Sequence, residues 1–159
     1  MPHSVYVHIP FCKSKCKYCA FTSFPVKEEN EKIGYVYSLL KEITENYRGE
    51  KLNTLYFGGG TPSLMPVDLL SKIIKKFNIN SNTEVTIEIN PDDANKDYLD
   101  KLEQIGINRI SIGSQTFNDE ILIQIGRRHN SKQICEAVKY AKKAGFENLS
   151  VDLIYGLPK

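Results

Sequence analysis

The chain has 159 residues, of which 41% are hydrophobic, 10% aromatic and 25% charged, a composition typical of one ordinary globular domain. This composition excludes a disordered or collagen-like chain. The formal charge is only +2 and no basic run exceeds Arg127-Arg128, so bulk electrostatics predicts neither nucleic-acid nor membrane-surface binding. The sequence contains no apolar stretch of about 18 residues and opens without a secretory signal, which predicts no transmembrane segment and a cytoplasmic location.

Strand-like and helical segments alternate along the chain. Strands rich in β-branched and aromatic residues are expected over 4–9, 53–57, 84–90, 108–112 and 149–154. Apolar residues recurring every three or four positions predict helices over 31–47, from Pro66 to Phe77, from an Asn95 cap to Gly106, over 118–125, and from a Ser131 cap to Ala144. The alternation predicts an α/β fold in which a parallel sheet of five strands carries helices outside.

Unusual residues follow or close each predicted strand. In strand order they are a group of cysteines, a glycine run ending in Thr61, Glu88 with Asn90, Ser114 with Gln115, and Asp152. Ligands of parallel α/β sheets and barrels lie at the carboxyl ends of the strands. These residues are therefore predicted to converge on one site.

Three of the four cysteines are clustered. Cys12, Cys16 and Cys19 lie within eight residues, whereas Cys135 lies in a predicted helix and is interpreted as a small packed hydrophobe. His8 is interpreted as a hydrogen-bonded core histidine. Three close thiolates suit zinc or an iron–sulfur cluster. The spacing favours a four-iron cluster with one iron open to another ligand, and it leaves zinc, a disulfide or inert thiols as alternatives.

The other polar groups are weaker signals when each is taken alone. The run Gly58-Gly59-Gly60 permits close backbone approach to a ligand, but it also fits a tight turn between a strand and a helix. Carboxylates such as Glu88 and Asp152 can accept hydrogen bonds from hydroxyl groups, yet at strand ends they are often only solvated or ion-paired.

Six motifs in chain order carry a family resemblance. They are 6–19 (YVHIPFCKSKCKYC), 58–63 (GGGTPS), 88–91 (EINP), 111–118 (SIGSQTFN), 126–129 (GRRH) and 152–158 (DLIYGLP). Together they resemble the radical S-adenosylmethionine (SAM) superfamily, and within it the coproporphyrinogen-oxidase-like branch, over the entire chain. The resemblance implies a partial (β/α) radical SAM barrel in one core domain, 1–159, truncated before its last strand and a C-terminal domain.

The resemblance also implies a ligand set. Cys12, Cys16 and Cys19 would hold three irons of a [4Fe–4S] cluster, and the amino and carboxylate groups of SAM would bind the fourth. The residues implied around the cofactor are Tyr6, Tyr18, Gly59, Gly60, Thr61, Glu88, Gln115, Arg127 and Asp152. For the two tyrosines, aromatic packing beside the loop is the alternative. No catalytic residue is assigned.

Two features distinguish branches within this family. Phe21 stands where the decarboxylating oxidases carry a further cysteine, and the first strand starts almost at Met1, where they carry an N-terminal extension. Both features resemble the heme-chaperone branch. That branch implies a protein that binds heme or porphyrin, passes heme to an acceptor protein and uses a reducing electron donor.

The alternatives are an oxygen-independent coproporphyrinogen III oxidase, which performs radical oxidative decarboxylation in porphyrin biosynthesis, and a related radical SAM methyltransferase. The family's heme-linked motif His-Asn-x-x-Tyr-Trp does not occur, because the sequence has no Trp. We therefore expect a truncated copy whose sheet has an exposed edge.

Overall fold

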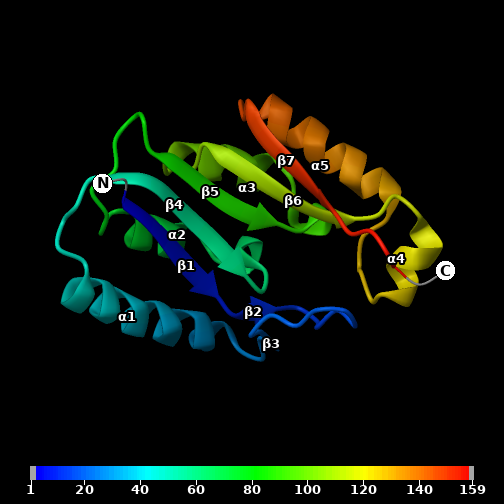
Figure 1. Ribbon diagram of the computed structural model, residues 1–159, viewed down its shortest axis with the longest axis horizontal. Helices are drawn as coiled ribbons and strands as arrows, with labels where there is room; N and C mark the ends of the chain where they lie inside the picture. Colours follow the sequence, from blue (N-terminus) through cyan, green and yellow to red (C-terminus); the bar gives the residue numbers. More distant parts are fainter. Residues whose placement is uncertain (1–2, 158–159) are drawn as a thin grey trace.

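The computed structural model describes residues 3–157, so Pro158, the last residue of the predicted 152–158 motif, lies outside the described residues. A five-stranded parallel sheet forms its centre (Figure 1). The strands are β1 (His3–Ile9), β4 (Leu52–Gly59), β5 (Glu84–Ile89), β6 (Arg109–Gln115) and β7 (Asn148–Leu153), and they are adjacent in that order. A separate two-stranded ribbon pairs β2 (Phe11–Cys12) with β3 (Phe24–Pro25).

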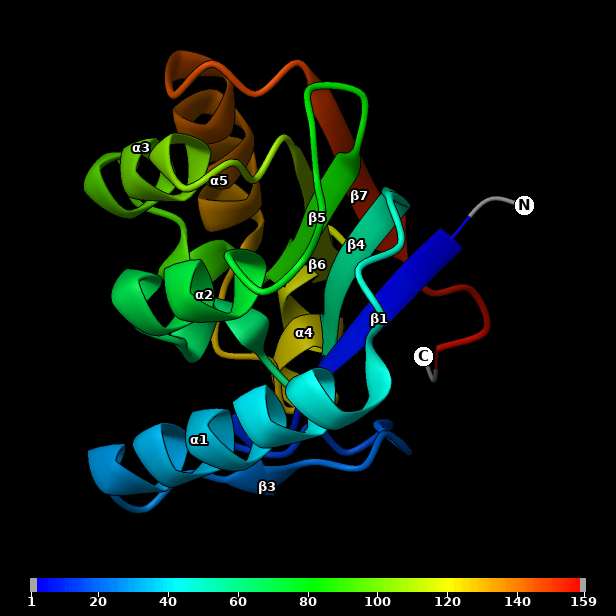
Figure 2. The same ribbon diagram turned by 90° about the vertical axis from the view of Figure 1, so that its left-hand side faces the viewer.

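Helices cover one face of the sheet. Figure 2 shows α1, α2, α3 and α5 on the same side of the strands. Their bounds are Glu29–Asn46, Val67–Ile74, Lys96–Gln104 and Ser131–Lys143, while α4 spans Asp119–Gln124 and two 3-10 turns span Pro62–Leu64 (η1) and Pro91–Asp93 (η2). Within residues 3–157, none of these helices combines the length and apolar character needed to cross a bilayer.

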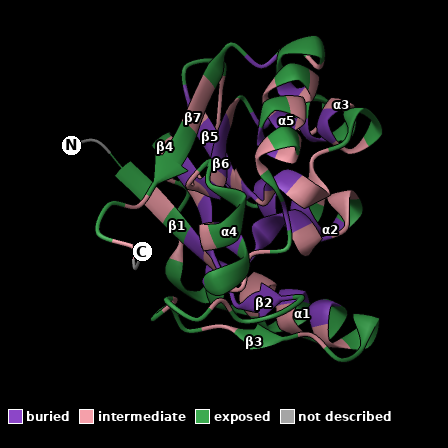
Figure 3. Cartoon of the chain, turned by 90° about the vertical axis from the view of Figure 1, so that its right-hand side faces the viewer, coloured by how far each residue is buried: buried purple, intermediate pink, exposed green. Residues whose placement is uncertain are grey.

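The hydrophobic core lies between the sheet and this helical layer, where Figure 3 shows the buried residues. Alternate strand residues such as Leu55, Phe57, Ile87 and Ile110 are fully buried there. Each such side chain contributes about 1.5–3 kcal/mol to folding. The intervening residues face the other side of the sheet, and Tyr56 and Glu88 are among them. The alternation of side chains along each strand therefore gives the sheet one face that packs in the core and one polar face.

Element bounds differ from the sequence prediction at several ends. The first helix starts at Glu29 rather than 31, because Glu28 and Glu31 form a capping box. The second helix ends at Ile74, and Pro66 is its N-cap rather than part of its first turn. The β2–β3 ribbon was not predicted from the sequence, because its strands have only two residues each.

The cap of α5 was also assigned to the wrong residue. The N-cap is Asn130, whose side chain accepts the Gln133 backbone N–H and completes a capping box, so Ser131 is the first helical residue. The Asn95 cap of α3 is confirmed, because its side chain accepts from the Tyr98 backbone N–H. All five predicted parallel strands and their helices are present.

Candidate functional site

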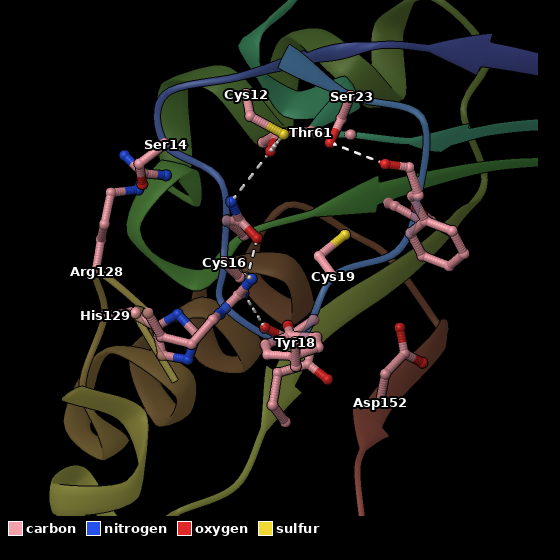
Figure 4. Close-up of a pocket in the computed structure, with 18 of the residues that line it drawn as sticks. Cys12, Ser14, Cys16, Tyr18, Cys19, Ser23, Thr61, Arg128, His129 and Asp152 are labelled. Carbon is pink, nitrogen blue, oxygen red and sulfur yellow. Dashed lines mark hydrogen bonds between the residues drawn. The ribbon is translucent and has the colours of Figure 1, made fainter. Parts of the chain in front are cut away.

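A cavity of about 480 Å³ opens at the carboxyl ends of the strands. Its wall combines the loop between β2 and β3, the ends of β4, β5, β6 and β7, and the segment after α4. Cys12, Cys19 and Asp152 approach this space from different elements (Figure 4). Every cysteine and cofactor residue implied by the sequence lines the cavity, with the exception of Tyr6.

The loop that carries the cysteines is fixed by backbone hydrogen bonds. We refer to its residues 13–23 as the cysteine loop. Cys12 is buried in β2, and its carbonyl oxygen accepts from the N–H of Val26 at 2.9 Å. Further along, the N–H of Lys17 donates to the carbonyl oxygen of Ile125 at 3.0 Å, and that of Cys19 donates to Cys16 at 3.1 Å. The loop is therefore held to both β3 and the end of α4.

The three clustered thiols line one cavity. All four cysteines are free thiols. Across residues 3–157, no three His, Cys, Asp or Glu side chains are arranged to hold a single metal ion. Soft sulfur donors spread around a common space suit a cluster whose metal atoms are bound separately. Three soft sulfur donors around one cavity fit an iron–sulfur cluster.

Two donors face the cysteine sulfurs. The hydroxyl of Thr61 donates to Cys12 Sγ and the guanidinium Nη1 of Arg127 donates to Cys16 Sγ, both at 3.6 Å. A guanidinium beside a sulfur ligand adds positive charge and a hydrogen bond, which are the means by which a protein tunes such clusters.

The glycine run lets the backbone approach the cysteines. A Cβ on Gly60 would lie 2.7 Å from the carbonyl oxygen of Phe11 and 3.0 Å from Cys12 Sγ. Gly59 has φ +114, and its Cβ would lie 2.7 Å from the ring of His8. The N–H groups of Gly60 and Thr61 donate to β1 and β2 carbonyls at 2.7 Å. Glycine is required here by both space and conformation.

Glu88 has a defined donor for each carboxylate oxygen. The hydroxyl of Tyr56 donates to Oε1 at 2.8 Å, and the N–H of Gly59 donates to Oε2 at 3.2 Å. Burial raises the pKa of Glu88, although these two hydrogen bonds oppose the shift. Tyr56 is a site residue that was not predicted from the sequence, and its place two residues before the glycine run was the available signal.

Arg127 carries an unpaired buried donor. Its Nη2 donates to Asn90 Oδ1 at 2.7 Å and to the carbonyl oxygen of Gly113, whereas its buried Nε has no partner within residues 3–157. An unpaired buried N–H costs about 1–3 kcal/mol, so its presence beside a cavity indicates a missing acceptor. A carboxylate group of a ligand would satisfy it.

His129 is a buried neutral base in the same wall, and sequence reasoning noted it only as part of a motif. Its Nε2 lies 3.2 Å from the carbonyl oxygen of Ser114, which only accepts, so Nε2 carries the proton. Its Nδ1 is then a buried acceptor that has no partner in the described part of the chain. Burial, reinforced by the nearby charge of Arg127, lowers the pKa of His129 to about 4.

The depressed pKa of His129 predicts a stability change with pH. Between pH 6.5, the ordinary pKa of histidine, and about pH 4, His129 is protonated in the unfolded chain but neutral in the folded chain. The stability of the folded state therefore falls as the pH falls through this range. A His129→Gln variant should show a flatter decline in urea midpoint from pH 7 to pH 4.5. The exposed His3, changed to Gln, is the control and should leave the profile unchanged. Identical profiles for wild type and His129→Gln would contradict the assignment.

Asp152 and Gln115 complete the far wall. The hydroxyl of Ser111 is 2.9 Å and 3.0 Å from the two carboxylate oxygens of Asp152. Gln115 has φ 68, the left-handed region, at the register shift where β6 ends. A Cβ on Gly113 would lie 3.1 Å from the Gln115 amide nitrogen, so the glycine leaves room for that side chain. Strain at a cavity wall is typical of functional sites.

Tyr6 lies beside the site rather than in its wall. It is 57% exposed, stacks on Tyr56 with ring centroids 6.0 Å apart, and its hydroxyl lies 3.1 Å from His8 Nδ1. The predicted hydrogen bonding of His8 is confirmed by Nε2 and the carbonyl oxygen of Thr22, 2.7 Å apart, but His8 is only half-buried. Cys135 was predicted wrongly as a packed residue: it is exposed, because α5 buries a different face.

Comparisons with known proteins agree with this geometry. The Radical SAM superfamily model matches residues 6–159. The heme chaperone HemW of Lactococcus lactis is 42% identical over 162 residues, covering 99% of this chain and 42% of that protein. The oxygen-independent coproporphyrinogen III oxidase of Escherichia coli is 34% identical, covering 99% of this chain and 36% of that protein.

The structure of coproporphyrinogen III oxidase (HemN) from Escherichia coli superposes with a TM-score of 0.91 at 34% identity, covering 99% of this chain and 38% of that one. The chain thus spans less than half the length of these relatives. The five-stranded sheet corresponds to part of a radical SAM barrel, which confirms the predicted fold class. By its motifs, its sheet and these matches, the chain belongs to the radical SAM superfamily.

Proposed function

We propose that this chain is the cofactor-binding part of a heme chaperone. Cys12, Cys16 and Cys19 hold a [4Fe–4S] cluster, and SAM binds beside it. The observation that carries the proposal is that three free thiols and the unpaired Nε of Arg127 line one cavity. The 42% identity to a heme chaperone supports the choice of branch. When bound, the cluster supplies an electron for reductive cleavage of SAM.

The remaining wall residues bind and orient the cofactor. Arg127 Nε donates to the methionine carboxylate, and Gly59, Gly60 and Thr61, which line the cavity, lie along the methionine end. Glu88 and Asp152 accept hydrogen bonds from the ribose hydroxyls. The further cofactor contacts in this proposal are Tyr18 and Gln115, which line the cavity. Tyr6, which stacks on Tyr56 beside the cavity wall, is also proposed as a cofactor contact.

The partners follow from the same proposal. They are heme or a related porphyrin, a protein that accepts heme, and a reducing electron donor for the cluster. The names of the relatives support a tetrapyrrole ligand, since one is a heme chaperone and the other a coproporphyrinogen III oxidase. The oxidase is the second candidate function, favoured by the TM-score of 0.91 to its structure.

Anaerobic reconstitution tests this proposal. The chain should bind iron and sulfide and then SAM, measured by metal analysis, absorbance and equilibrium titration. Asp152→Asn should weaken SAM binding about tenfold, because a hydrogen bond to a charged group contributes about 1.5–3 kcal/mol. Asp68→Asn, at an exposed position in α2, is the matched control and should bind SAM as the wild type does.

The outcome also separates the two candidate functions. Heme binding without turnover supports the chaperone. Formation of 5′-deoxyadenosine together with decarboxylation of coproporphyrinogen would overturn it in favour of the oxidase. Equal SAM affinity in the wild type and Asp152→Asn would remove Asp152 from the cofactor site.

A further inference from the structure

The cavity mouth exposes apolar side chains from two elements. Phe21 on the cysteine loop is 64% exposed, and Leu153 at the end of β7 is 63% exposed. Both line the cavity, as does Tyr18, which is also exposed. Scattered apolar residues on a surface are ordinary, but a group of them around the mouth of a cavity marks a binding surface. We refer to Phe21 and Leu153 as the apolar mouth.

The backbone that directly follows Phe21 is held by contacts at Thr22 and Phe24. His8 Nε2 donates to the carbonyl oxygen of Thr22 at 2.7 Å, and this tautomer follows because a carbonyl only accepts. The N–H of Phe24 donates to the carbonyl oxygen of Pro10 at 2.9 Å, and its ring packs edge-on against Phe11 with centroids 5.5 Å apart. Phe21 is therefore presented on an anchored loop, which lowers the entropy lost when a ligand contacts it.

The same loop is strongly basic. Residues 1–27 contain no Asp or Glu, and the cysteine loop carries Lys13, Lys15 and Lys17. Lys13 forms a salt bridge with Asp93. In the described part of the chain, no acidic side chain forms a salt bridge with Lys15 or Lys17. Lys15 Nζ lies 3.4 Å from the carbonyl oxygen of Phe21, so a cation stands next to the exposed aromatic residue.

We propose that the apolar mouth binds one face of a porphyrin ring while Lys15 binds a carboxylate on its edge. A porphyrin combines a flat apolar ring with anionic side groups, and the mouth presents exposed apolar side chains with the cation of Lys15 next to Phe21. The inference rests on the proposed function, since it names the surface by which the chaperone holds its porphyrin. The proposal also makes Phe21 a porphyrin contact on the same loop that carries Cys16 and Cys19.

Titration with a metal-free porphyrin, mesoporphyrin IX, tests this inference. Without iron in the ring, axial ligation by a cysteine or histidine cannot contribute to binding. The full chain is reconstituted anaerobically and binding is followed by the porphyrin absorbance band. Phe21→Ala should raise Kd about tenfold, and Lys15→Gln should raise it about threefold and reduce its dependence on salt.

Matched controls lie on α1. Tyr37→Ala removes an aromatic residue that is 79% exposed, and Lys41→Gln removes an exposed lysine, so both should bind porphyrin as the wild type does. Iron, sulfide and SAM binding are measured on the same samples and should be unchanged in Phe21→Ala and Lys15→Gln.

Two results would overturn the inference: an unchanged Kd in Phe21→Ala, or a reconstituted wild type that binds SAM but no porphyrin. An equal loss in Phe21→Ala and Tyr37→Ala would also overturn it, since the effect would not be specific to the mouth. A wild type that takes up neither iron nor SAM instead contradicts the proposed function.

Discussion

A Cys16→Ala variant should take up almost no iron under conditions that fully load the wild type. Each of the three thiols lining the cavity is needed to hold one metal atom of the proposed cluster, and no fourth cysteine is close enough to replace it. Cys16 Sγ is also the sulfur that accepts from Arg127, so its loss removes a contact in the wall. Iron and sulfide per chain, with the absorbance of the reconstituted protein, measure the effect.

Cys135→Ala is the matched control for this experiment. Cys135 is an exposed free thiol on α5 and does not line the cavity, so its loss should leave iron loading at the wild-type value. Stoichiometric iron in Cys16→Ala would defeat the assignment of the cysteine triplet. Equal losses in both variants would point to nonspecific iron binding by thiols.

Gly60→Ala should damage both the fold and the site. The added Cβ would lie 2.7 Å from the Phe11 carbonyl oxygen and 3.0 Å from a Pro10 backbone carbon, and backbone atoms cannot rotate away. The strand that carries Cys12 must therefore shift. Overpacking of this kind costs about 1–3 kcal/mol. A lower urea midpoint with an unchanged slope, together with reduced iron loading, is the expected result.

The same substitution at Gly34, Gly34→Ala, should raise stability instead of lowering it. Gly34 lies in α1, and a Cβ there would meet nothing within 4 Å. Alanine should stabilise the helix by about 0.5–1 kcal/mol because it reduces the backbone entropy lost on folding. If Gly60→Ala kept wild-type stability and iron loading, the close approach between the end of β4 and β2 would not constrain the site.

Sequence alone predicted the elements because their signals are local. The apolar stripes of α2 and α3 and the alternation of β5 are repeated over many residues, so a single exception does not hide them. Helix ends depend on one or two hydrogen bonds, which explains why the cap of α5 was assigned to Ser131 instead of its neighbour Asn130. The β2–β3 ribbon was missed because two-residue strands carry no periodic signal.

The convergence of the site residues was also predictable, because parallel strands in sequential order bring their carboxyl ends to one edge. The orientation of each side chain was not. Tyr6 and Tyr56 lie on adjacent strands at paired positions, yet it is Tyr56 that donates to Glu88. The unpaired Nε of Arg127 and Nδ1 of His129 likewise depend on which atoms are buried around them.

The sequence by itself therefore determined the family, the alternation of five parallel strands with helices, and most of the proposed cofactor residues that line the cavity, because each depends on residue type and spacing along the chain. Only the tertiary structure decided which polar atoms are satisfied, which pKa values shift, and that Cys135 is exposed and Phe21 stands at the mouth. These properties depend on desolvation and on distances between residues far apart in the sequence, which no local pattern records.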